Sequence, residues 1–209
     1  VEASGAGKWQ PAAGGTAPYA VVLEGGSVSI GGNLAAGSGK DYIRSTAGDI
    51  GITGTLNAND SSTLESARNI TVGGDVTGGA LTGKAAQSIS MQNIGMGGKA
   101  AMLTATNGGI TAGNFIGGDL TGTARQFIQL GNIGTSTQAA GNAVLTATDG
   151  SITAGSFNGD VLRADATGDV TINGSAAAFT GATLMGSGVS VKGSLTSSDG
   201  RHYIKSSAG

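Results

Sequence analysis

The stretch LTATNGGITAGNF at residues 103–115 recurs as LTATDGSITAGSF at residues 145–157, with ten of 13 positions identical and an offset of 42. A second pair, LTGKAAQSISMQNIG at 81–95 and LTGTARQFIQLGNIG at 120–134, matches at nine of 15 positions with an offset of 39. A third pair, GKDYIRSTAG at 39–48 and GRHYIKSSAG at 200–209, is offset by 161. These offsets are two, two and eight multiples of a unit of about 20 residues, which indicates a repeat array.

Each unit carries apolar residues at alternate positions, the pattern of a β-strand with one buried face. The first apolar position falls at Val28, Ile50, Ile70, Ile89, Ile110, Ile128, Ile152, Val170 and Val189. Two residues later the chain has Ile30, Ile52, Val72, Met91, Ala112, Leu130, Ala154, Ile172 and Val191. A third apolar position follows at Leu34, Leu56, Val76, Ile94, Phe115, Ile133, Phe157 and Leu195. A further set precedes the first, at Val22, Ile43, Leu64, Leu81, Leu103, Leu120, Leu145, Leu162, Leu184 and Ile204.

A unit this short cannot bury its apolar face alone, whereas stacked copies bury it against one another. We therefore predict an all-β fold, a parallel β-helix (β-solenoid) of about 9–10 coils of ~20 residues, right-handed because parallel crossovers almost always are. Ile52, Val72 and Leu130 are expected to point inward, and Phe115, Phe157 and Phe179 to stack inside. A propeller blade of ~40 residues fits the offsets of 39 and 42 but not the shorter period.

The composition excludes several other classes. Of 209 residues 41 are Gly, charged residues make up 11%, no Cys is present and the net charge is -2. Gly without a three-residue period and with two Pro excludes collagen, and the Gly content disfavours helix bundles. A disulfide scaffold is excluded because there is no Cys. The small net charge gives no reason to expect nucleic acid as a partner.

The repeat pattern divides the chain into two parts. Residues 1–20 lack it, so we expect an irregular N-terminal segment or an incomplete coil there, followed by β-helix repeats over 21–209. No polar cap is evident at either end, and the last repeat stops in the middle of a unit. We therefore expect the repeats to continue beyond both ends in the parent protein.

The segments GGDVTG at 73–78, GDVTING at 168–174 and GSLTSSDG at 193–200 resemble the repeats of filamentous haemagglutinin-type exoproteins of two-partner secretion. The resemblance covers residues 21–209 and implies an interior part of a large bacterial adhesin. Such proteins leave the cell through an outer-membrane secretion transporter, which would act on a region not included in these repeats, and are secreted or held at the cell surface. Contact-dependent toxin-delivery proteins share the repeats, so a stalk of that kind is an alternative.

Two matching strands offer a candidate contact for glycans. Tyr42 and Arg44 flank Ile43, and Tyr203 and Lys205 flank Ile204. If the isoleucines point inward, each strand presents an aromatic ring beside a cation on the outside, about eight coils apart, which suits a carbohydrate or an anionic glycan. An ordinary solvated strand surface explains the same residues. Host cell-surface glycans or extracellular proteins are the expected partners, bound by a monomer.

Other polar residues are weaker candidates. The cluster Asp160, Asp165 and Asp169, with Arg163 among them, is the best basis for the alternative of a β-helical polysaccharide-degrading enzyme, although aspartates at turns explain it as well. Asp75, Asp119 and Asp160 are expected about two coils apart on one face. We expect His202, the single histidine, to lie with the aligned Asp41 at an exposed turn.

The sequence predicts a protein without enzymatic activity. Residues 78–84, GGALTGK, match a P-loop pattern, but Ala85 replaces the Ser or Thr that would bind Mg²⁺ and no helix is expected to follow. We predict no catalytic, cofactor-binding or metal-binding residues. A trimeric stalk or fibre is a further alternative. It differs from the adhesin shaft because it predicts a trimer, whereas the shaft is expected to be a monomer.

Overall fold

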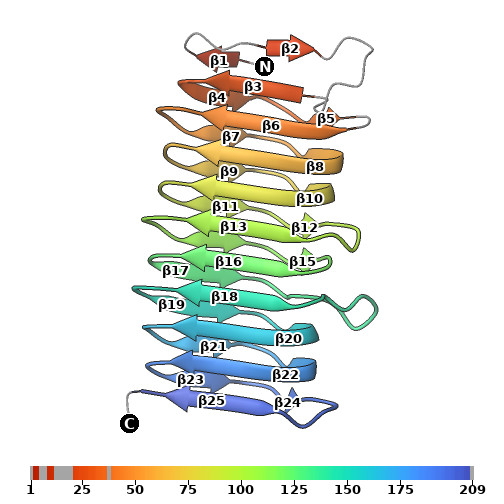
Figure 1. Cartoon of the computed structure of the whole chain (residues 1–209), viewed down its shortest axis with the longest axis vertical. Helices are drawn as coiled ribbons and strands as arrows, with labels where there is room; N and C mark the ends of the chain where they lie inside the picture. Colours follow the sequence, from red (N-terminus) through yellow and green to blue (C-terminus); the bar gives the residue numbers. More distant parts are fainter. Residues whose placement is uncertain (1, 5–8, 12–20, 37–38, 208–209) are drawn as a thin grey trace.

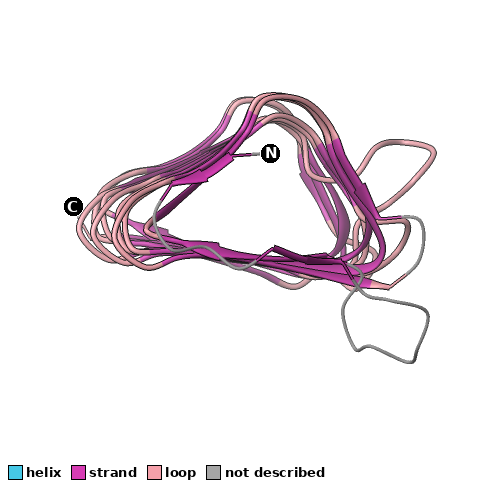
Figure 2. Cartoon of the chain, turned by 90° about the horizontal axis from the view of Figure 1, so that it is seen from above, coloured by secondary structure: helices cyan, strands magenta, loops and turns pink. Residues whose placement is uncertain are grey.

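The computed structural model of the chain describes residues 2–4, 9–11, 21–36 and 39–207, with side chains described from residue 21 onward. These residues form a parallel β-solenoid of about nine coils with no helix. The coils stack into a rod, and the outline of each coil is triangular when the rod is viewed along its axis (Figures 1 and 2). The predicted all-β parallel β-solenoid with coils of about 20 residues is confirmed.

Each coil contributes strands to two long sheets. The first sheet contains, in spatial order, β1 (Glu2–Ser4), β4 (Ser27–Ile30), β7 (Ile50–Ile52), β9 (Ile70–Val72), β11 (Ile89–Met91), β14 (Ile110–Ala112), β17 (Phe127–Leu130), β19 (Ser151–Ala154), β21 (Val170–Ile172) and β23 (Val189–Val191). The path of the second sheet is β2 (Trp9–Pro11), β3 (Val21–Gly25), β6 (Lys40–Ser45), β8 (Leu56–Ser66), β10 (Val76–Ala85), β13 (Ala101–Ala105), β16 (Leu120–Ala124), β18 (Ala143–Ala147), β20 (Phe157–Ala166), β22 (Ala176–Gly186) and β24 (Leu195–Thr196). Four further strands join it, namely β5 (Leu34–Ala36), β12 (Ile94–Gly95), β15 (Phe115–Ile116) and β25 (His202–Ser206).

The first sheet pairs equivalent residues of successive coils, as the repeat predicts. Val28 pairs with Ile50, Ile50 with Ile70, and the series continues in register to Val189. Ile52, Val72 and Leu130 are buried. The third apolar set likewise stacks in register, and it includes Ala176, which the apolar pattern does not reveal. The rod therefore has a continuous apolar interior.

The pairing of the second sheet corrects the fourth apolar set, and two of the inward columns of this sheet show the correction. Leu23, not Val22, pairs with Ile43. Leu64 pairs with Gly83 rather than Leu81, and Gly83 pairs with Leu103. The first inward column is thus Leu23, Ile43, Leu64, Gly83, Leu103, Gly122, Leu145, Ala164, Leu184 and Ile204, and the second is Val21, Asp41, Ser62, Leu81, Ala101, Leu120, Ala143, Leu162, Ala182 and His202.

These two columns are complementary in volume. Wherever one of these two positions from β8 to β22 holds Leu, the other holds Ser, Ala or Gly, so the two columns together give the core one large side chain in each of these coils. At Gly122 an added Cβ would lie 3.1 Å from Leu145 Cδ2 of the next coil. The missing side chain therefore makes room for the leucine of the neighbouring coil, which preserves close packing.

The coils differ in length, and these differences occur at one corner of the triangle. Strands β8, β10, β20 and β22 run around this corner without a break, with register shifts at Gly78/Ala80 and Gly159/Val161. In other coils the strand is interrupted, and loops of residues 96–100 and 134–142 project there (Figures 1 and 2). Phe179 lies at this corner and is 47% exposed, so its predicted place inside is wrong, whereas Phe115 and Phe157 are buried.

The N-terminal segment pairs in the opposite sense from the coils. Strand β1 pairs antiparallel with β4, and β2 pairs antiparallel with β3. The expectation of an irregular segment over 1–20 falls mostly on residues outside the described part, namely 1, 5–8 and 12–20.

Hydrogen-bonded side chains form a ladder along another corner. The residue before the third apolar position is Asn33, Thr55, Asp75, Asn93, Asn114, Asn132, Ser156, Ser175 or Ser194 in successive coils. Asn93 Oδ1 accepts a hydrogen bond from the backbone N–H of Asn114 at 3.0 Å, and Asn114 Oδ1 accepts one from Asn132 at 2.8 Å. This ladder satisfies backbone donors where the chain turns.

Candidate functional site

The four predicted glycan-contact residues lie in two columns of outward side chains on the second sheet. Because Ile43 is buried, Tyr42 and Arg44 point to the opposite, outer face. We name the column that contains Arg44 the axial strip, defined as Glu24, Arg44, Glu65, Lys84, Thr104, Thr123, Thr146, Asp165, Met185 and Lys205. Tyr42 and Tyr203 lie in the neighbouring outward column. The two members of each column are eight coil steps apart, about 38 Å at the ~4.8 Å strand spacing.

Charges alternate along the N-terminal part of the axial strip. Arg44 lies 4.0 Å from Glu24, and Lys84 Nζ lies 3.9 Å from Glu65 Oε1. The Tyr42 hydroxyl donates a hydrogen bond to Glu65 Oε2 at 3.1 Å. Partial burial, followed by this bond to a carboxylate, raises the pKa of Tyr42. Half-exposed ion pairs of this kind add little stability, but they offer hydrogen-bond donors and acceptors side by side.

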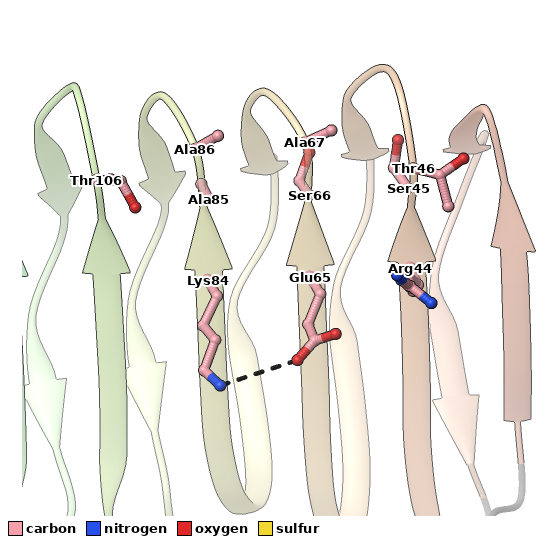
Figure 3. A pocket seen from close by; sticks show the side chains of 10 residues that line it. All are labelled: Arg44, Ser45, Thr46, Glu65, Ser66, Ala67, Lys84, Ala85, Ala86 and Thr106. Atoms are coloured by element: carbon pink, nitrogen blue, oxygen red, sulfur yellow. Dashed lines mark ion pairs between the residues drawn. The ribbon is translucent and has the colours of Figure 1, made fainter.

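A shallow depression of about 360 Å³ adjoins these charged residues (Figure 3). It is long in the direction of the rod axis, because its lining comes from four successive coils: Arg44, Ser45, Thr46, Glu65, Ser66, Ala67, Lys84, Ala85, Ala86 and Thr106. Small side chains where the strands end leave this hollow, and the longer side chains of Arg44, Glu65 and Lys84 border it. The site is therefore a groove open to solvent rather than an enclosed pocket.

The C-terminal members of the predicted pair also border depressions. Lys205 lines one of about 370 Å³ together with Asp165 and Met185. Tyr203 lines another of about 420 Å³ together with Arg201 and His202. Tyr203 and Lys205 thus border two different depressions, whereas Tyr42 does not line the depression beside Arg44.

Asp41 does not lie at an exposed turn, so that expectation is wrong. It occupies an inward position on β6, between Val21 and Ser62 of the adjacent coils, and it is 0% exposed. Neither of its carboxylate oxygens has a hydrogen-bond partner among the described residues. Burial raises the pKa of this carboxyl to about 6. The aligned His202 occupies the same inward column but is exposed, because it lies on the last described coil.

The alternation of the strand contains the signal that was missed. Asp41 has the same parity as Ile43 and Ser45, and all three are buried. A strand with a buried Ile43 must also turn Asp41 inward. The alignment with His202 therefore gave the right column but the wrong environment.

The acidic cluster of the enzyme alternative is not brought together. Asp160 and Asp165 are both on β20, five residues apart along extended chain, or about 16 Å. Asp160 accepts a hydrogen bond from the Thr180 hydroxyl, and Asp165 lies 3.7 Å from Arg163. Asp169 lies beyond the next turn, where its Oδ1 accepts a bond from the backbone N–H of Gly188 at 2.8 Å.

The predicted common face of the Gly-Asp sites is also wrong in part. Asp75 belongs to the side-chain ladder before the third apolar position, whereas Asp119 lies before the second-sheet strand β16. The two occur in similar sequence contexts but at different corners of the coil. Gly-Asp followed by Val or Leu therefore does not mark one position in the coil.

The P-loop-like residues 78–84 lie within strand β10, and Lys84 is paired with Glu65. Within the described residues, no group of three or more His, Cys, Asp and Glu side chains is placed to hold a metal ion. The same part of the chain contains no helix long and apolar enough to span a bilayer. Comparisons with protein-family models, with curated proteins and with solved structures give no match.

Proposed function

We propose that this chain is part of the shaft of a large, secreted bacterial surface adhesin of the filamentous haemagglutinin type, and that its outer face contacts glycans. The proposal is supported by a rod whose inward columns maintain one geometry in every coil, which leaves the outward residues free to vary. The observation that carries it is the groove beside Arg44, Glu65 and Lys84, where charged and hydroxyl groups lie along the rod axis. The role is binding rather than catalysis.

The binding surface is suited to weak contacts that are repeated on many molecules. Its donors and acceptors are half-exposed and already partly paired. A sugar that displaces these pairs exchanges one set of hydrogen bonds for another, so a single site gains little free energy. Many copies displayed on a cell surface raise the overall affinity by multivalency. This requirement fits an adhesive filament.

The proposal is tested by measuring adhesion of the 209-residue chain to host cells and to a glycan array. We expect binding that falls when Arg44 and Lys84 are both replaced by Ala. Lys192→Ala is the matched control, because it removes one cation from an exposed position just after β23 of the other sheet. Absence of binding to any cell or glycan would reduce the chain to a spacer and contradict the proposal.

Localisation provides an independent test of the surface role. Antibodies raised against this chain should label intact, unpermeabilised cells of the source bacterium or detect the protein in the culture medium. Labelling that requires permeabilised cells would contradict a secreted shaft. A stalk that delivers a toxin would also be labelled, but it would inhibit neighbouring cells on contact, which an adhesin does not predict.

A further inference from the structure

Two of the depressions lie on the same strip of the rod. The first is bordered by Arg44, Glu65 and Lys84 of the axial strip, and the second by Asp165 and Lys205 of the same strip. Both occur where strands of the second sheet end and the chain turns, so they occupy equivalent places in their coils. The coils between them present Thr104, Thr123 and Thr146 on the strip, which gives a path of hydroxyl groups from one depression to the other.

The charges of the axial strip cancel. Its acidic residues are Glu24, Glu65 and Asp165, and its basic residues are Arg44, Lys84 and Lys205. A strip with three charges of each sign exerts no net attraction on a polyanion or a polycation. It presents donors, acceptors and hydroxyls in alternation instead, which is what the hydroxyl groups of an uncharged sugar require.

We propose that the ligand of the axial strip is a linear, uncharged polysaccharide that lies along the rod axis and occupies both depressions at once. This inference rests on the glycan-binding function proposed above and specifies its ligand class. The distance from Arg44 to Lys205 is eight coil steps, or about 38 Å. A chain shorter than this cannot contact Arg44 and Lys205 together. A longer chain reaches both, and its second contact forms as an intramolecular event with a high effective concentration.

The test uses size-fractionated, uncharged linear oligosaccharides of glucans, mannans and galactans, titrated into the 209-residue chain by calorimetry. The association constant is expected to rise at least about 100-fold once the oligosaccharide exceeds about 38 Å. Affinity should change little with salt, because no net charge is neutralised. A gradual rise with length and no step would overturn the proposal, as would tighter, salt-sensitive binding of a sulfated polysaccharide.

Variants distinguish the two depressions. Lys205→Ala should abolish the step, while short oligosaccharides still bind at the depression beside Arg44. Lys192→Ala should change neither. Retention of the step in Lys205→Ala would overturn the two-site arrangement. If no uncharged oligosaccharide binds while cells or other glycans still do, this inference fails and the proposed function survives; if nothing binds at all, both fail.

Discussion

The N-terminal coils and the central coils have the same backbone arrangement but differ in the side chains that they bury. All the buried polar side chains in the described part of the chain lie on β6 and β8, and they are Asp41, Ser45, Ser62 and Ser66. In the central coils the positions in register with these four residues hold Ala or Leu. The backbone hydrogen bonds that stack the coils are the same in both regions. The side chains therefore determine the stability of each coil separately.

The N-terminal coils also show which polar groups the interior accommodates. Ser45 Oγ donates to the carbonyl of Gly26 at 2.8 Å, and Ser66 Oγ donates to the carbonyl of Gly48 at 3.0 Å. A buried hydroxyl that makes such bonds costs little. Neither oxygen of Asp41 has a hydrogen-bond partner among the residues that the structure describes, and an isolated buried carboxylate is expensive. We therefore expect the N-terminal coils to be the weaker region at neutral pH.

The largest effect is expected from shortening a central leucine. Leu145 is fully buried, and its in-register neighbours in the column are Gly122 and Ala164, which cannot move into a cavity. Leu145→Ala should lower the free energy of unfolding by about 2–5 kcal/mol. Ile43→Ala should cost less at neutral pH, because a cavity beside Asp41 admits water to this buried carboxylate.

Urea denaturation combined with hydrogen exchange resolved by coil measures this difference, since coils of a solenoid can open separately. Equal losses of unfolding free energy at the two positions, or a larger loss for Ile43→Ala, would contradict the expectation that the N-terminal coils are the weaker region.

Asp41 gives the next largest effect, with a defined pH dependence. Its pKa is raised to about 6 in the folded state, so folding favours the protonated form. Stability is greatest below the unfolded pKa near 4 and falls as pH rises toward 6, with a total loss of about 3 kcal/mol at higher pH. Asp41→Ala, which copies the volume pattern of Ala101 and Ala143, should recover that amount at pH 8 and much less at pH 4.

Asp41→Asn is the control for this prediction, because it keeps the size and polarity of the side chain and removes the charge. It should be less stable than Asp41→Ala and lack the pH dependence of the wild type between pH 4 and 7. A stabilisation by Asp41→Ala that is the same at pH 4 and pH 8 would show that the carboxylate charge is not the cause.

The contrast between the regions also explains what the sequence could predict. In the first sheet every inward position is apolar, so the alternation from Val28 to Val189 predicted both the fold and the register. In the second sheet Gly83 and Gly122 occupy inward positions that an apolar pattern does not recognise. The prediction therefore assigned Leu81 and Leu120, each two residues earlier, to the column that Gly83 and Gly122 occupy.

The candidate site could be predicted only in part. The alternation around Ile43 predicted that Tyr42 and Arg44 point outward. The depression beside Arg44 depends on small side chains from four coils, and no single unit contains that information. The burial of Asp41 was available from parity, but its alignment with His202 obscured it. Residue partners across coils follow from the register, and in the second sheet the register is visible in paired side-chain volumes rather than in hydropathy alone.

A glycine in the first inward column gives a smaller effect that tests the volume argument. A Cβ at position 122 would lie 3.1 Å from Leu145 Cδ2 and 3.5 Å from Ile128 Cδ1. Gly122→Ala should therefore cost about 1–3 kcal/mol by overpacking. Gly51→Ala is the matched control, because an added Cβ there meets nothing within 4 Å. In the Leu145→Ala background the cost of Gly122→Ala should disappear, and a cost that persists would place the strain in the backbone.

The smallest effect is expected at Asp49, a carboxylate eight residues from Asp41 with the opposite pH dependence. Asp49 Oδ1 accepts hydrogen bonds from the backbone N–H and the side-chain amide of Asn69, both at 2.9 Å. These bonds, the backbone one first, lower the pKa of Asp49. Its contribution is present above the unfolded pKa and is lost as pH falls through the folded pKa.

Because Asp49 is exposed, Asp49→Ala should cost about 1 kcal/mol or less at pH 7. Measured from pH 3 to 8, the wild-type chain should lose the contribution of Asp49 at the acidic end and that of Asp41 at the neutral end. In a plot of the free energy of unfolding against pH, removing Asp49 should flatten only the acidic part of the curve. Removing Asp41 should flatten only the part near pH 6. If both substitutions flattened the same part of the curve, the two carboxylates would share one environment, and the distinction between a partnered turn and an unpartnered interior would not hold.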